Sequence, residues 1–110
     1  MEHSTERDGG ATVVRLTGDV DLQHSPEARK VLLAAAKGGR PVVVDLSGVS
    51  YIDSSGIASL VEGLQEARKS GGSLALAAVS EGAMRVLHLA RLDKVFVIAD
   101  DVSAAIAKLG

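Results

Sequence analysis

Cysteine and tryptophan are absent from this 110-residue chain, and its aromatic side chains are limited to Tyr51 and Phe96. The lack of cysteine excludes a disulfide framework, a thiolate zinc site and a cysteine nucleophile, and it fits a reducing compartment. The scarcity of aromatic rings leaves almost no surface on which nucleic-acid bases could stack. The chain has 12 basic and 14 acidic residues, which gives a formal net charge of -2. Because nucleic-acid binding usually requires an excess of positive charge, we expect no direct nucleic-acid partner.

Long apolar segments are also missing. The longest apolar runs, residues 31–36 and 74–79, reach six residues each, whereas a membrane-spanning helix needs about 20. Residues 1–7 are polar and mixed in charge, without the apolar stretch of a secretory signal. We therefore expect a cytoplasmic protein that does not insert into a membrane.

Apolar residues nevertheless make up 46% of the chain, which is enough to fill a core. The length predicts a single domain that spans residues 1–110. Along the chain, strand-like and helical spacings of apolar residues alternate between glycine-rich breaks. This order predicts an α/β fold, in which a mixed, mostly parallel sheet of four to five strands packs against about four helices.

The same spacing predicts the individual elements. Residues 11–17 alternate as a strand exposed on one side, and residues 3–7 are its candidate hairpin partner. Further strands are predicted at residues 41–46, 73–79 and 95–99, with a loop at 47–52. Helices are predicted after four capping signals, which are Ser25, residues 53–56, Ser80, and Asp100 or Asp101.

Catalytic and metal-binding patterns are not recognisable in the sequence. His3, His24 and His88 are scattered and share no metal-ligand spacing. A phosphate-binding loop ending in Gly-Lys-Ser/Thr and a nucleophile elbow are both absent. We therefore predict a protein that is not an enzyme and that uses no metal ion or cofactor.

Residues 53–56 (DSSG) place a carboxylate and two hydroxyls at the start of a helix that follows a buried strand. Aspartate and serine are ordinary helix caps, so a purely structural role is one interpretation. In the other interpretation, the free N–H groups and the positive end of the helix dipole stabilise a phosphate on one of the serines. A phosphoserine adds about -1.5 to -2 charges and would act as a surface switch. The residues alone leave both interpretations open.

With this segment in place, the sequence resembles the STAS domains, and within them the bacterial anti-sigma-factor antagonists, also called anti-anti-sigma factors. The resemblance covers nearly the whole chain and rests on residues 16–21 (LTGDVD), 44–46 (VDL) and 51–56 (YIDSSG). It implies that the unmodified protein binds an anti-sigma factor that is itself a serine kinase, and so frees a sigma factor. Phosphorylation breaks this binding, and a PP2C-type phosphatase restores the active form.

The resemblance also implies roles for individual residues. The phosphate acceptor is the second serine of the motif, Ser55, while Asp21, Asp53, Ser54 and Gly56 line the partner surface. For Asp21, an Asx turn that closes a loop is an equal alternative. Gly56 either relieves crowding in the first helical turn or lets the kinase approach closely.

Two observations widen the interpretation. Ala90-Arg91 stands where many antagonists carry a small residue followed by glycine, which implies different partner contacts near that end. STAS domains also occur as small subunits of lipid-transport ABC systems and in stress-signalling assemblies, so a non-sigma role is the alternative function. A module that binds a small ligand is a third alternative, supported only by the alanine-rich core, which could leave a pocket. A serine hydrolase is the fourth, but the sequence shows no general base for its nucleophile. Self-association is not predicted in either direction.

Overall fold

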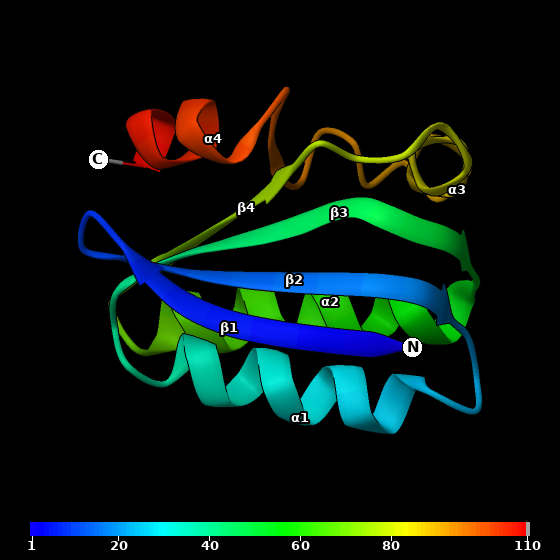
Figure 1. Ribbon diagram of the computed structural model, residues 1–110, viewed down its shortest axis with the longest axis horizontal. Helices are drawn as coiled ribbons and strands as arrows, with labels where there is room; N and C mark the ends of the chain where they lie inside the picture. Colours follow the sequence, from blue (N-terminus) through cyan, green and yellow to red (C-terminus); the bar gives the residue numbers. More distant parts are fainter. Residues whose placement is uncertain (110) are drawn as a thin grey trace.

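A five-stranded sheet with helices on both of its faces organises the chain (Figure 1). The computed structural model describes residues 1–109. The strands lie in the order β1-β2-β3-β4-β5; β1 is antiparallel to β2, and the other neighbours pair in parallel. The predicted mixed, mostly parallel sheet is confirmed. In chain order the elements are β1 (Glu2–Asp8), β2 (Ala11–Val20), α1 (Ser25–Ala36), β3 (Pro41–Ile52), α2 (Ser54–Lys69), β4 (Ser73–Ala77), α3 (Glu81–Leu89), β5 (Val97–Ala99) and α4 (Val102–Leu109).

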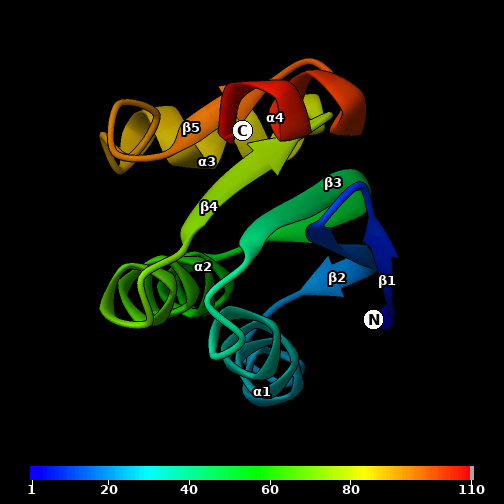
Figure 2. The same cartoon turned by 90° about the vertical axis from the view of Figure 1, so that its left-hand side faces the viewer.

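The core lies in two layers separated by the sheet. Helices α1 and α2 lie together on one side of the sheet and α4 lies on the other, while α3 packs against β3 (Figure 2). The larger apolar cluster joins Leu32 of α1 and Leu60 of α2 to the strands. The smaller cluster lies under α4 and includes Val13, Val43 and Ala105. Alternate residues of the central strands therefore point into opposite layers, as the pleat of a buried parallel sheet requires.

The parallel pairing of β2 and β3 decides where the site forms. Both strands end at the same edge of the sheet, and each is followed by a helix, α1 or α2. The two connecting segments therefore meet at one end of the molecule, which is where ligands and partners bind in open parallel sheets.

The third strand is longer than predicted. β3 runs from Pro41 to Ile52, so the loop predicted at residues 47–52 was wrong. These residues continue the pairing with β2 after register shifts, for example Gly48 with Thr17. A Cβ atom at Gly48 would lie 2.7 Å from Cγ2 of Thr17, so a larger residue would require the Thr17 side chain to move. The register shifts break the apolar alternation, which explains why the spacing indicated a loop.

The second strand is buried on both faces for most of its length. Residues 11–17 were predicted to be exposed on one side, but Val13 is fully buried under α4. The covering helix comes from the far end of the chain, so no local pattern around Val13 could indicate it. The predicted hairpin is confirmed: β1 pairs with β2 from Glu2 opposite Thr17 to Asp8 opposite Ala11.

Helix starts agree with the predictions in three of four cases. Asp53 caps α2, Ser80 caps α3, and Asp101 accepts a hydrogen bond at 2.7 Å from the N–H of Ala104 in α4. For α1, the capping position belongs to His24 and not to Ser25, whose hydroxyl donates instead to the carbonyl of Leu22.

Strands β4 and β5 are shorter than predicted. β4 ends at Ala77 and not at residue 79, because Ala78 adopts a left-handed conformation with φ of 51°. β5 begins at Val97 and not at residue 95, because the N–H groups of Val95 and Phe96 both bond to the carbonyl of Leu92 in a turn.

Arg91 ends α3 in a conformation that favours glycine. Its φ is 58°, its N–H bonds to the carbonyl of His88 at 3.0 Å, and the N–H of Leu92 bonds to the carbonyl of Leu87 at 2.9 Å. These two bonds form a Schellman motif, in which the residue just after the helix is usually glycine. The sequence departure at Ala90-Arg91 therefore has a structural consequence, a strained helix end.

Candidate functional site

Asp53 defines the start of α2. Its backbone is extended, and its Oδ1 accepts hydrogen bonds from the N–H groups of Ser55 at 2.9 Å and Gly56 at 3.2 Å. A carboxylate in this position satisfies helix N–H groups that have no partner within the helix. The first turn, which carries both serines of the motif, is thereby held in one conformation.

The second oxygen of Asp53 reaches the segment that follows β2. Oδ2 accepts a hydrogen bond at 3.2 Å from the N–H of Leu22, and the N–H of Asp53 bonds to the carbonyl of Val20 at 3.4 Å. The predicted site residues Asp21 and Asp53 thus belong to two segments that the fold brings together, as the resemblance implied by placing both on one surface. The hydrogen bonds that join the two segments were not predicted.

Gly56 is buried and packs against the strand residues behind it. A Cβ atom at this position would lie 2.3 Å from the carbonyl oxygen of Val20 and 2.6 Å from Cγ1 of Ile52. Real Cβ atoms do not approach other atoms so closely, so α2 can contact β2 and β3 at this point only through glycine. The contacts support the interpretation that Gly56 relieves crowding, because its free side faces the protein's own core.

Asp21 is held by its own turn. Its Oδ1 accepts a hydrogen bond from the backbone N–H of His24 at 3.1 Å. The same oxygen lies 2.7 Å from Nδ1 of the His24 ring, with which it pairs. Partial desolvation raises the pKa of the Asp21 carboxyl, but the hydrogen bonds and the charge of His24 outweigh it, so that the pKa lies below its ordinary value. The Asx-turn interpretation of Asp21 is supported, and the carboxylate remains partly exposed at the surface.

The two serines of the motif lie in different surroundings. Ser54 is exposed, while Ser55 is half-buried and lines an open groove of about 470 Å³ between α1 and α2. Arg29 and Glu62 face each other across the same groove and form an ion pair at 2.8 Å. The hydroxyl of Ser59, one turn after Ser55, contacts the carbonyl oxygens of Ser25 and Ser55 at 3.1 and 3.2 Å.

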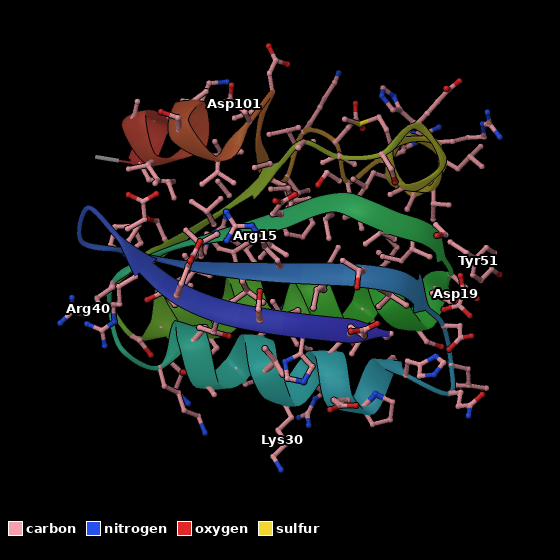
Figure 3. All side chains as sticks on the ribbon, viewed as in Figure 1. Arg15, Asp19, Lys30, Arg40, Tyr51 and Asp101 are labelled. Carbon is pink, nitrogen blue, oxygen red and sulfur yellow. The ribbon has the colours of Figure 1, made fainter. Side chains whose placement is uncertain are left out.

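Two exposed apolar side chains flank Asp53. Leu22 is 74% exposed and Tyr51 is 53% exposed, so two large side chains present apolar surface to solvent at this end of the molecule. Tyr51 pairs with Asp19 across β2 and β3, and both lie at the same end of the molecule in Figure 3. We call Leu22, Tyr51, Ser54 and Ser55 the Ser55 patch. Sequence reasoning noted Tyr51 but missed Leu22, whose exposure depends on the turn that Asp21 and Asp53 stabilise.

Metal-ligand clusters and membrane-spanning helices are absent from the part of the chain that the structure describes. Within residues 1–109, no three His, Asp or Glu side chains are grouped so that they could hold a metal ion. No described helix is long and apolar enough to cross a membrane.

Comparison with known proteins shows the family of the chain. The family model described as "Mlab, STAS domain" matches residues 3–99. The chain belongs to the STAS-domain family. This STAS domain is 32% identical over 91 residues to the anti-sigma-B factor antagonist of Bacillus subtilis (strain 168), covering 83% of the chain and 80% of that relative.

Solved structures show the same fold. A crystal structure of an anti-sigma factor antagonist from Mycobacterium paratuberculosis has a TM-score of 0.89 at 24% identity, covering 98% of this chain and 92% of that one. The phosphorylated form of the Bacillus cell fate determinant SpoIIAA has a TM-score of 0.74 at 20% identity, covering 99% of this chain and all of that one. The expected STAS fold and family are confirmed.

Proposed function

We propose that this STAS domain, which extends over residues 1–110, is a cytoplasmic anti-sigma-factor antagonist. In its unphosphorylated form it binds an anti-sigma factor that is a serine kinase, and so frees a sigma factor. The observation that carries the proposal is Ser55 on an ordered first turn of α2, next to two exposed apolar side chains. The relative from Bacillus subtilis, named as an anti-sigma-B factor antagonist, supports the same role.

The Ser55 patch has the composition of a docking site. Leu22 and Tyr51 offer apolar surface that is exposed in the free protein, and an aromatic anchor of this kind often dominates binding energy. Asp21 and Asp53 hold the backbone on both sides of the patch before any partner arrives. A preorganised surface binds with a smaller entropy cost than a flexible one. In this proposal Ser54 and Asp21 contact the partner, while Gly56 positions the first turn.

Phosphorylation of Ser55 would act by charge and not by refolding. The helix N-terminus tolerates a phosphoryl group, since an anion there is stabilised by about 0.3–1 kcal/mol. Asp53 lies next to Ser55, while Glu62 in the same groove is paired with Arg29. The added charge of about -1.5 to -2 would repel an acidic partner surface, and its desolvation would oppose binding to an apolar one. The phosphorylated form of SpoIIAA keeps a fold like that of this chain, which supports a switch without refolding.

The acceptor residue is tested with the anti-sigma kinase from the native host. After incubation with kinase and ATP, mass spectrometry should place one phosphate on Ser55, and a PP2C-type phosphatase should remove it. Ser55→Ala should abolish the modification, whereas the matched variant Ser54→Ala should retain it. Phosphate on Ser54 in the unmodified chain would contradict the assignment.

The switch is tested by binding. Ser55→Ala should bind the kinase with the affinity of the unmodified protein, while Ser55→Asp should bind roughly tenfold more weakly or worse, because a repelling charge at an interface costs about 1.4 kcal/mol or more. Equal affinities of the two variants would contradict the proposed switch.

A second candidate is a subunit of a lipid-transport ABC system. The family model that matches the chain is described as "Mlab, STAS domain", and small subunits of such transport systems are one of the uses of STAS domains. A pull-down from the native host separates the two functions: a serine kinase supports the antagonist, and an ABC ATPase supports the transporter subunit.

A further inference from the structure

A second groove lies between β1 and the C-terminal half of α1. Its volume is about 360 Å³, within the roughly 300–1,000 Å³ that is common for small-molecule sites. Apolar atoms of Val31, Ala34 and Ala35 form the helical wall. None of the residues of the Ser55 patch lines this groove.

The opposite wall is a strand with two different faces. His3 and Arg7 of β1 point into the groove, together with the threonine between them. Glu6 belongs to the other face, where it bonds to Arg15. The alternation of the strand therefore sends the basic side chains into the groove and keeps this acidic one out of it.

Positive charge is concentrated at one end of the groove. Arg7 and Arg40 both line it, and within residues 1–109 neither forms an ion pair. The described lining residues include no carboxylate. Glu27 lies beside the groove and pairs with His3 at 3.1 Å. His3 is about 13 Å along the strand from Arg7, so this carboxylate is far from the arginines. The C-terminus of α1 carries about half a negative charge, which repels an anion. The two full positive charges of Arg7 and Arg40 outweigh this repulsion.

We propose that this groove binds a small anionic amphiphile. Its carboxylate or phosphate head lies between Arg7 and Arg40, and its acyl tail lies along Val31, Ala34 and Ala35. An apolar wall with a few polar groups at one end is the usual design of a site for such a ligand. In Figure 3, Arg40 lies at the opposite end of the molecule from Asp19 and Tyr51. The inference therefore does not rest on the proposed function of Ser55.

The test is an NMR titration of the isotope-labelled chain with decanoate, decyl phosphate and the neutral control decanol, each below its micelle-forming concentration. Saturable shifts are expected at the amides of Val31, Ala34 and Ala35 with both anions. Decanol should bind at least about tenfold more weakly, because it lacks charge-assisted bonds to arginine. Stronger binding of decyl phosphate or of decanoate identifies the head group that the site prefers.

Matched variants decide whether the arginines provide the specificity. The double variant Arg7→Gln with Arg40→Gln should weaken decanoate binding by about tenfold or more, while Arg85→Gln, on the exposed surface of α3, should leave it unchanged. Circular dichroism shows whether each variant is folded. The inference is overturned if neither anion produces saturable shifts, if shifts spread over the whole chain, if decanol binds equally well, or if the folded double variant binds like the unmodified chain.

Discussion

Asp53 accepts a hydrogen bond at 3.2 Å from the backbone N–H of Leu22, which lies 31 residues earlier in the chain. The other oxygen of the same carboxylate caps α2. One side chain thus holds both the helix that carries Ser55 and the turn that presents Leu22.

Asp53→Ala should destabilise the fold by about 1–2 kcal/mol, because the helix loses its cap and Leu22 loses its partner. Urea unfolding measures the loss, and hydrogen exchange should become faster at the amide of Leu22. Asp19→Ala is the matched control, since Asp19 is exposed at the same end of the molecule. An unchanged urea midpoint for Asp53→Ala would show that the cap contributes nothing.

Gly56→Ala should be more harmful than an ordinary glycine substitution in a helix. The new Cβ would lie 2.3 Å from the carbonyl oxygen of Val20, and overpacking of this kind costs about 1–3 kcal/mol or more. Gly82→Ala in α3 is the control, because its Cβ would meet only one atom, at 3.9 Å, and alanine favours a helix by up to about 1 kcal/mol. Equal thermal stability of the two variants would contradict the close packing at Gly56.

Leu22→Ala and Tyr51→Ala should each weaken binding of the anti-sigma kinase about tenfold, because they truncate the exposed apolar part of the Ser55 patch. Thermal stability should change little, since both side chains are largely exposed. Val97→Ala is a suitable control, because Val97 is exposed and borders a different hollow near Arg68. Calorimetry against the kinase gives the affinities, and equal losses for all three variants would argue against a localised docking site.

Stability should depend on pH through Asp21. Its pKa is lowered in the folded protein, so the stabilisation is fully present above the ordinary aspartate pKa and is lost as the pH falls through the folded value. Below about pH 4, the unmodified protein should therefore lose stability more steeply than Asp21→Asn. Urea midpoints measured from pH 6 down to about pH 3 test this, and parallel curves for the two proteins would contradict it.

Arg91→Gly should stabilise the protein by about 0.5–1 kcal/mol, because a left-handed backbone strains a long side chain such as arginine but not glycine. The φ of 58° at Arg91 provides the reason. Arg85→Gly, in the interior of α3, should instead destabilise by about 1 kcal/mol. Denaturant midpoints measure both, and a loss of stability in Arg91→Gly would mean that the arginine side chain contributes more than the strain costs.

Much of the fold could be predicted because its signals are local. The helix starts at Asp53 and Ser80 depend on side chains that bond within three residues, and the apolar spacing of the helices follows from their own periodicity. The burial of Val13 could not be predicted, because α4 covers it from the far end of the chain. The second half of β3 was missed because the register shifts around Gly48 break the alternation.

The candidate site shows the same division. The DSSG motif and its place after a buried strand predicted a site at the start of α2, and the resemblance to STAS domains singled out Ser55 as the acceptor, which stays a prediction. The bond between Asp53 and Leu22 was not found, because a backbone N–H donor has no sequence signature. The groove lined by Arg7 and Arg40 was also missed, since its residues come from two strands, a helix and a loop that only the fold assembles.

The crossover from β2 through α1 to β3 also affects the time at which the site forms during synthesis. Leu22 and Asp53 belong to segments on either side of this crossover, and closing such a loop is unfavourable until the strands have paired. A chain still emerging from the ribosome, or one that has unfolded, therefore carries the serine without the surface around it. Under the proposed function, the kinase would engage only folded molecules, so unfolding and phosphorylation each reduce the amount of antagonist that is available for binding.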